Sequence, residues 1–234
     1  MTWHAGLPWN SRYRLLSSLF RHNRDYEINS SSPLSATGIG LSLKYNNTDF
    51  PINPSKGSII NIGFKHDPGL NNNQSWTPGE LELSKFFNLP KGENAEQRVI
   101  ALNVWAAHTF SDTLPPHYFG VTLGGLYRLR AYPIERFHDK SAIYYSAEYR
   151  VIPKSDLLRR LTFLDFVKLQ WWEVAIFFEF GRVAPSWDFK ELHDSMKRDF
   201  GLSLRVMANH DIGRFDIVWS EEGTAAWLMY GHPF

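Results

Sequence analysis

The chain has 234 residues, a formal net charge of +1, no cysteine and 15% aromatic residues. This near-neutral charge gives no electrostatic case for nucleic acid, so we expect no nucleic-acid partner. A chain without cysteine has no thiolate nucleophile and no thiolate ligand for a metal. No apolar run is long enough for a spanning helix, which argues against a helical membrane protein.

The amino-terminal segment, residues 1–35, shows no clear pattern, and we expect a poorly defined segment or a loop there. Residues 1–32 lack the apolar core of a secretory signal and include Arg12, Arg14, Arg21 and Arg24. A protein destined for an outer membrane needs such a signal. We therefore expect the chain to be the carboxy-terminal part of a longer protein, or one whose true start lies upstream.

Five stretches of about ten residues alternate apolar and polar side chains, which is the period of a β-strand with two different faces. They are 39–47, 97–110, 142–151, 172–182 and 200–209. In the fourth stretch, Trp172 and Phe178 share the apolar face while Glu173 and Glu179 share the other. The charges therefore gather on one face of the predicted sheet.

The length of these stretches favours a membrane over water. Strands of soluble domains average about five or six residues, whereas about nine to eleven tilted residues cross a bilayer. Aromatic residues lie near several ends of the stretches, as expected for the aromatic girdles of an outer-membrane barrel. A soluble β-sandwich binding module also alternates and is kept as an alternative, although its apolar faces would be exposed to water.

Nine strands are predicted in all. They lie near 37–48, 57–66, 79–88, 97–110, 141–152, 171–182, 200–209, 213–220 and 224–231. Residues 36–234 thus form the predicted barrel domain, with a long loop at 111–140. The leucine spacing within 155–170 predicts a short interfacial helix in another connection.

Several ordered motifs resemble those of one family. The loop contains Leu129-Arg130-Ala131-Tyr132 and is followed by a strand with Glu148-Tyr149-Arg150. Residues 49–57 read DFPINPSKG, residues 177–181 read FFEFG, and residues 213–216 read GRFD. Together they resemble the BamA, TamA and FhaC superfamily, the bacterial surface antigen family, over roughly residues 36–234.

This resemblance implies a loop that folds back into the barrel lumen. The family pairs the loop arginine with the acidic residue of the F-x-D-x-G strand, which here corresponds to Arg130 with Glu179; Tyr132 and Gly181 belong to the same two motifs. The alternation independently places Glu179 on the polar face, where a carboxylate favours a guanidinium partner. Ala131 stands where the family has glycine, and would be strained if the loop required a positive φ there.

The remaining candidate residues fall into two groups. The charged residues of the polar face are expected to form a lumen charge network; they are Glu148, Arg150, Glu173, Arg205, Arg214 and Asp216. Tyr230 and Phe234 share a parity at the carboxy terminus and resemble the membrane-targeting end of outer-membrane barrels. The histidines have no ligand spacing, and no catalytic motif is present, so we expect no metal, no cofactor and no enzyme.

The sequence therefore predicts an all-β protein, a transmembrane antiparallel β-barrel in the bacterial outer membrane. By resemblance it acts in outer-membrane protein insertion or polypeptide translocation without a covalent step. Its expected partners are the lipid bilayer, unfolded outer-membrane or secreted polypeptides, and the family's periplasmic modules. The alternative of a different class is a passive pore or structural barrel without insertase activity.

Nine strands leave open edges, which hydrocarbon does not tolerate. The family closes with about sixteen strands, so we expect this chain to be the carboxy-terminal part of such a barrel, with the other half missing. Two other closures are open at this point: residues 12–20 supply a tenth strand, or two copies meet.

Overall fold

The structure, a computed structural model, describes residues 2–10, 12–24, 34–70, 75–111, 120–155, 169–208 and 211–234. Of residues 2–10, 22–24 and 34–36 it describes the backbone alone.

Thirteen strands and one five-residue helix make up the described elements. They are β1 (Thr2–Asn10), β2 (Tyr13–Arg24), β3 (Leu34–Asn46), β4 (Gly57–His66), β5 (Thr77–Asn88), β6 (Ala95–Phe110), β7 (Val121–Leu123), β8 (Phe137–Asp139), β9 (Ser141–Pro153), β10 (Leu169–Ala184), α1 (Phe189–His193), β11 (Lys197–Ala208), β12 (Asp211–Ser220) and β13 (Gly223–Tyr230). No helix among the described residues is both long and apolar enough to pass through a membrane.

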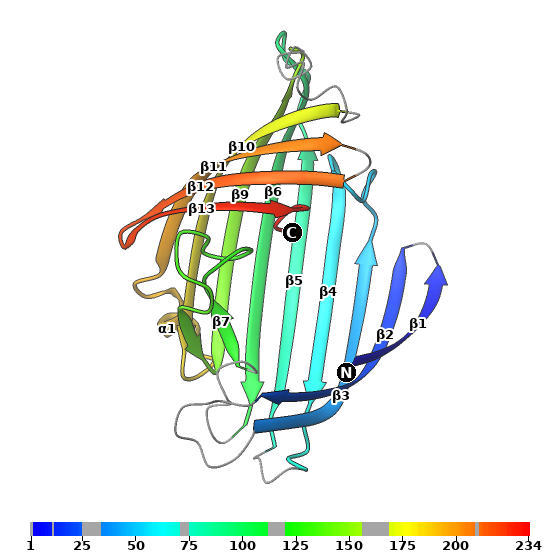
Figure 1. Ribbon diagram of the computed structural model, residues 1–234, viewed down its shortest axis with the longest axis vertical. Helices are drawn as coiled ribbons and strands as arrows, with labels where there is room; N and C mark the ends of the chain where they lie inside the picture. The colour runs from blue at the N-terminus through cyan, green and yellow to red at the C-terminus, as the bar shows by residue number, and fades with distance from the viewer. Residues whose placement is uncertain are drawn as a thin grey trace.

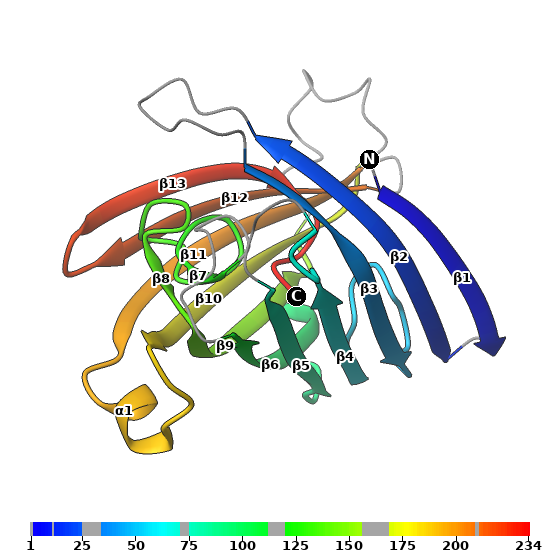
Figure 2. The ribbon, with the colours of Figure 1, turned by 90° about the horizontal axis from the view of Figure 1, so that it is seen from below.

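Eleven of these strands form one antiparallel sheet in the order β1-β2-β3-β4-β5-β6-β9-β10-β11-β12-β13. The sheet curves into an open trough (Figures 1 and 2). In the described part of the chain its two edge strands, β1 and β13, do not pair with each other. The small β7–β8 hairpin and the carboxy terminus lie on its concave side (Figure 2). One large sheet replaces the two packed sheets that the β-sandwich alternative requires.

Burial follows the predicted alternation. On β10 the concave face holds Glu173, Phe177 and Glu179, which are buried, whereas Ile176 and Phe178 on the convex face are about half exposed. Pairing keeps the faces in register, because Glu179 of β10 lies opposite Ser146 of β9 and Asp199 of β11. The charged face of the sheet is therefore its interior, and the apolar face is its outside.

All nine predicted strands are present, as β3 to β6 and β9 to β13, and the all-β fold is confirmed. The expectation for residues 1–35 is wrong in one respect, because β1 and β2 occupy most of this segment. Strand β2 corresponds to the tenth strand that the sequence analysis considered for residues 12–20. Its mixed residues hide the alternation: Ser17 and Ser18 are adjacent, and so are Leu15 and Leu16. The helix predicted within 155–170 falls mostly outside the described residues.

The connections define two ends of the trough. At the turn end lie residues 47–56 and 89–94; at the loop end lie residues 67–70, 75–76, 111, 120–140, 185–196 and 221–222. The long connection between β6 and β9 turns back into the trough, and its hairpin contacts both β9 and β10. This connection, residues 120–140 as described, is called the lumen loop below.

Candidate functional site

The lumen loop bends sharply where its sequence permits. Gly124 and Gly125 have φ values of 112° and 105°, a region that glycine enters without steric cost. Leu129 has φ 52° although it is not glycine, and its side chain is fully buried. Packing of Leu123, Leu129 and Tyr132 against the sheet offsets this local strain. The loop therefore presents residue 130 at a fixed position inside the trough.

Arg130 occupies the centre of the site. Its Nε donates to Glu179 Oε1 (2.9 Å), Nη1 to Asp216 Oδ2 (2.9 Å) and Nη2 to Glu148 Oε1 (3.1 Å). Its backbone N–H also donates to Glu179 Oε2 at 2.8 Å. The guanidinium lies 3.5 Å from the centre of the Phe177 ring, a cation–π contact. One side chain thus joins three carboxylates on three strands, β9, β10 and β12.

Burial makes these contacts interdependent. Arg130, Glu148, Glu179 and Asp216 are all fully buried. A buried charge that loses its partner keeps its desolvation penalty, so breaking such a pair costs about 3–5 kcal/mol. Tyr144 adds a further hydrogen bond, from its hydroxyl to Glu179 Oε1 at 2.6 Å. Glu179 therefore accepts bonds from both the loop and the sheet.

The two residues after Arg130 fix the loop further. The Ala131 N–H donates to Asp199 Oδ2 at 2.8 Å, and the Tyr132 hydroxyl donates to the Arg198 carbonyl at 3.1 Å. Ala131 is not among the residues with positive φ, so alanine is unstrained where the family has glycine. The positive φ falls instead on Leu129, two residues earlier.

Gly181 makes room for the lumen loop. A Cβ at this position would lie 3.0 Å from Leu123 Cδ1 and 3.2 Å from Leu129 Cδ1. Both leucines belong to the buried cluster that seats the loop. The glycine of the FFEFG motif is therefore explained by close approach of the loop and not by its own backbone conformation.

The predicted charge network surrounds this centre. Arg205 donates to Glu148 Oε2 (2.7 Å) and to Glu173 Oε1 (3.1 Å), and Arg150 donates to Glu148 Oε2 (2.8 Å). Glu148 thus links three arginines, Arg130 included. Every member of the network is buried on the concave face.

The last two strands are attached to the loop as well. Arg214 Nε lies 3.2 Å from Asp216 Oδ2, and its Nη2 donates to the Leu126 carbonyl at 3.0 Å. The indole N–H of Trp227 donates to the Arg130 carbonyl at 2.6 Å. Among the described residues β13 pairs with β12 alone, so the lumen loop gives this end hairpin a second attachment.

The carboxy terminus differs from its predicted arrangement. Tyr230 is 84% exposed on the convex face, but the expectation that Phe234 shares that face is wrong. The chain turns inward at Gly231 (φ 79°), and Phe234 packs against Phe86 of β5, with ring centres 6.4 Å apart. His232 follows the same path and its Nδ1 lies 2.9 Å from Arg205 Nη1. The targeting role of Tyr230 and Phe234 stays a prediction.

The 47–56 turn also reaches into the network. The Asn53 amide donates to Glu173 Oε2 at 3.3 Å. Asp49 holds the turn in shape by accepting from the Ser55 hydroxyl (2.5 Å), the Ser55 N–H (2.9 Å) and the Lys56 N–H (3.1 Å). Partial burial opposes ionisation of Asp49, but these bonds outweigh it and lower its pKa below the ordinary 3.8.

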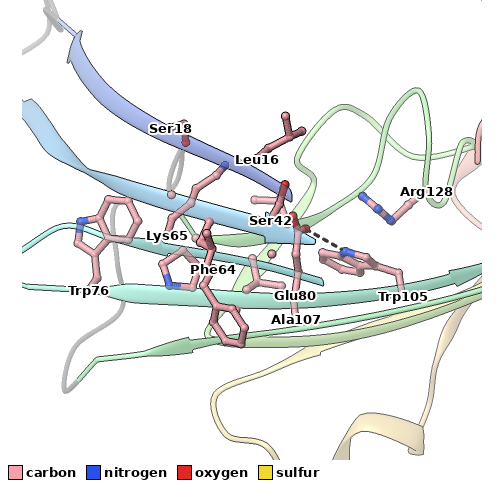
Figure 3. A pocket seen from close by; sticks show the side chains of 18 residues that line it. Leu16, Ser18, Ser42, Phe64, Lys65, Trp76, Glu80, Trp105, Ala107 and Arg128 are labelled. Atoms are coloured by element: carbon pink, nitrogen blue, oxygen red, sulfur yellow. Dashed lines mark hydrogen bonds between the residues drawn. The ribbon is translucent and has the colours of Figure 1, made fainter. Parts of the chain in front are cut away.

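The other half of the trough is emptier. A cavity of about 460 Å³ lies between β2–β6 and the lumen loop, lined partly by Ser18, Ser42 and Lys65 (Figure 3). At its border the Trp105 indole donates to Glu80 Oε2 at 3.2 Å. Arg128 of the loop lies over the Trp105 ring, 4.2 Å from its centre. The described interior is thus packed on one side and open on the other.

Several residues of the site are absent from the sequence-based prediction. Asp199 lies on the inward parity, but the predicted strand begins one residue later, at 200. Tyr144 and Phe177 also have the inward parity, yet an aromatic residue gives no sign of a polar site. Asn53 lies in the DFPINPSKG motif and Trp227 lies in the predicted strand 224–231, but neither pattern shows that the side chain reaches the centre. His232 reaches it from the chain end, and no local signal in the sequence marks it. Among the described residues no cluster of three or more acidic or histidine side chains is arranged for a metal.

Comparison with known proteins identifies the family. The profile of the Omp85 superfamily domain matches residues 9–222, most of the chain. The crystal structure of BamA from Haemophilus ducreyi lacking POTRA domains 1–3 is similar, with a TM-score of 0.66 at 15% identity. The alignment covers 98% of this chain and 52% of that one, so this chain spans about half its length. No curated protein matches. The chain belongs to the Omp85 superfamily of outer-membrane β-barrels.

Proposed function

We propose that this protein acts in outer-membrane protein insertion or polypeptide translocation, with the lumen loop as a lock that Arg130 closes. The observation that supports this proposal best is the burial of Arg130 against carboxylates of β9, β10 and β12. A passive barrel has no need to hold a loop in its lumen through four fully buried charges, because such a cluster adds little net stability.

The lock connects the lumen loop to the strands beside which a polypeptide would pass, or with which it would pair. Each of the last five strands of the sheet contributes at least one contact to the loop; among the contacting residues are Glu148, Glu179, Asp199, Asp216 and Trp227. Release of Arg130 would therefore loosen the end hairpin β12–β13 together with the loop. A freed strand edge can pair with an extended segment of substrate, and an emptied trough can admit one.

The proposed partners follow from this mechanism. The convex face, with half-exposed Ile176 and Phe178, contacts the lipid bilayer of the outer membrane. An unfolded outer-membrane or secreted polypeptide is the substrate. The sheet as described is open, so the full barrel needs further strands, and the missing barrel half and periplasmic modules are proposed as its complement.

A double-mutant cycle tests the lock. Arg130→Ala removes the shared partner of three carboxylates and is expected to reduce assembly or transport strongly. Glu179→Ala is expected to cost less, because Arg130 keeps Glu148 and Asp216. The double variant should lose little more than Arg130→Ala alone. The readout is assembly or transport of a reporter polypeptide in outer-membrane preparations with the protein in its native context.

Arg136→Ala is the matched control, since Arg136 lies in the same loop but forms an exposed ion pair with Glu222 at 3.4 Å. Such surface pairs contribute about 0–1 kcal/mol, and activity should be retained. Independent, additive losses for Arg130 and Glu179 would contradict the lock. Full activity of both variants, with the barrel still folded on heat-modifiable gels, would favour the passive barrel.

A further inference from the structure

The loop between β10 and β11 packs part of its length against the outside of the sheet. Residues 185–196 fold back over the convex face of the sheet, and Figure 2 shows α1 outside the trough, opposite the lumen loop. Leu192 of α1 is buried against Ile143 of β9 and Ala184 of β10, two residues of the convex face. This segment is called the outer flap.

The outer flap covers polar groups of the convex face. The Tyr145 hydroxyl lies 2.8 Å from Nε2 of His193, and Arg182 donates to the carbonyl of Asp194. Tyr145 and Arg182 have the same parity as the lipid-facing residues Phe178 and Phe180. Without the flap, a hydroxyl and a guanidinium would face the bilayer near the loop end, where unpaired polar groups are costly.

The outer flap also carries exposed aromatic rings. Phe189 is 72% exposed and Trp187 is 50% exposed. Phe110, at the end of β6, is 59% exposed on the same convex face. His108 joins these segments, because its ring centre lies 4.7 Å from that of Phe110 and 6.2 Å from that of Trp187. Three large rings therefore gather outside the barrel at the level of the loop end.

Beside these rings the flap presents charge. Asp188 caps α1 by accepting from the Glu191 N–H at 2.9 Å, and Lys190 is exposed. Aromatic rings next to charged, solvated groups suit the boundary between headgroups and acyl chains, where one side of an element is apolar and the other is wet. The patch also continues the apolar convex face formed by Phe178 and Phe180.

We propose that the outer flap is an interfacial anchor, which inserts Trp187, Phe189 and Phe110 into the headgroup–acyl boundary of the leaflet at the loop end. It sets the depth of β9 and β10 in the bilayer. The occupant of this patch is the lipid surface, because the patch continues the lipid-facing side of the barrel. The proposal rests on the membrane location and not on the activity of the lumen loop.

Site-directed spin labelling tests the anchor. Because these 234 residues contain no cysteine, an introduced cysteine is the single labelling site among them. Labels are placed by Phe189→Cys and, as a second position, Trp187→Cys in the full protein folded into phosphatidylethanolamine–phosphatidylglycerol vesicles. Phe178→Cys is the hydrocarbon reference and Glu221→Cys, in the exposed β12–β13 turn, is the water reference. Collision rates with oxygen and with a water-soluble nickel chelate report the depth of each label.

The flap labels are expected to show an oxygen-to-nickel ratio between those of the two references. A ratio equal to that of Glu221→Cys would overturn the anchor. Low collision rates with both reagents would mean that a protein surface covers the patch, and would overturn it too. A Phe178→Cys label that behaves as in water would instead contradict the membrane location itself, while the assembly assay above tests the lock separately.

Discussion

At the scale of single residues, Gly181 and Arg130 depend on each other. Arg130 reaches Glu179 only because the loop leucines pack where a side chain at 181 would stand. The ion pairs of Arg130 and the close packing of the loop at Gly181 therefore depend on each other. The ion pairs are made by charged side chains, whereas the packing needs the absence of a side chain at position 181.

A pair of glycine variants tests this unit. Gly181→Ala would place a Cβ 3.0 Å from Leu123 Cδ1, and overpacking of this kind costs about 1–3 kcal/mol. Gly213→Ala is the control, because its Cβ would meet nothing closer than the Val206 carbonyl oxygen at 4.0 Å. We expect the first variant alone to unfold at lower urea concentration and to expose the loop to protease. Equal behaviour of the two would refute the steric role of Gly181.

At the scale of elements, the 47–56 turn connects a local structure to the network across the trough. Asp49 fixes the turn, and the turn carries Asn53 to Glu173 of β10. Asn53, at the turn end of the trough, thus helps to hold a carboxylate 120 positions away in the sequence.

The lowered pKa of Asp49 gives this turn a pH dependence. A carboxylate whose folded pKa is depressed stabilises the fold above its unfolded pKa, and the contribution is lost as pH falls through the folded value. The stability difference between wild type and Asp49→Asn should therefore be largest near neutral pH and vanish well below pH 3.8. Urea unfolding over a pH series measures it, with the exposed Glu96→Gln at the same end as control. A difference that does not change with pH would contradict the assignment.

At the scale of the whole molecule, the carboxy-terminal tail bridges the trough. Phe234 leaves the end of β13 and joins Phe86 of β5 and Val99 of β6, while the Arg150 guanidinium lies 5.3 Å from its ring centre. The tail therefore braces two halves of a sheet that has no pairing between its described edges.

Phe234→Ala and Tyr230→Ala should separate bracing from targeting. Removing the half-buried ring of Phe234 is expected to destabilise the barrel, by less than the about 3–5 kcal/mol typical of a fully buried phenylalanine. Tyr230 is outward and exposed, so its loss should leave unfolding unchanged and lower the yield of membrane-inserted protein. Urea midpoints and the inserted fraction measure the two effects. Equal destabilisation by both variants would count against the brace.

The sequence by itself determined nine of the thirteen described strands and their two faces. Alternation depends on adjacent residues alone, so nine strands and the inward charges could be predicted without any knowledge of packing. The resemblance of its motifs to those of the family likewise implied that Arg130 and Glu179 form a pair. The alternation pattern did not predict strand β2, because polar and apolar residues of this strand occur in adjacent pairs and break the period of two.

Only the tertiary structure decided which residues meet across the trough. Trp227 of β13 reaches the centre because the sheet curves, and curvature is a property of the whole sheet. Asn53 and His232 reach it because a turn and the chain end fold inward. The inward turn at Gly231 likewise reverses the face that parity predicts for Phe234. Period-two patterns hold only while the backbone stays in the strand, so contacts made by turns, loops and chain ends lie beyond their reach.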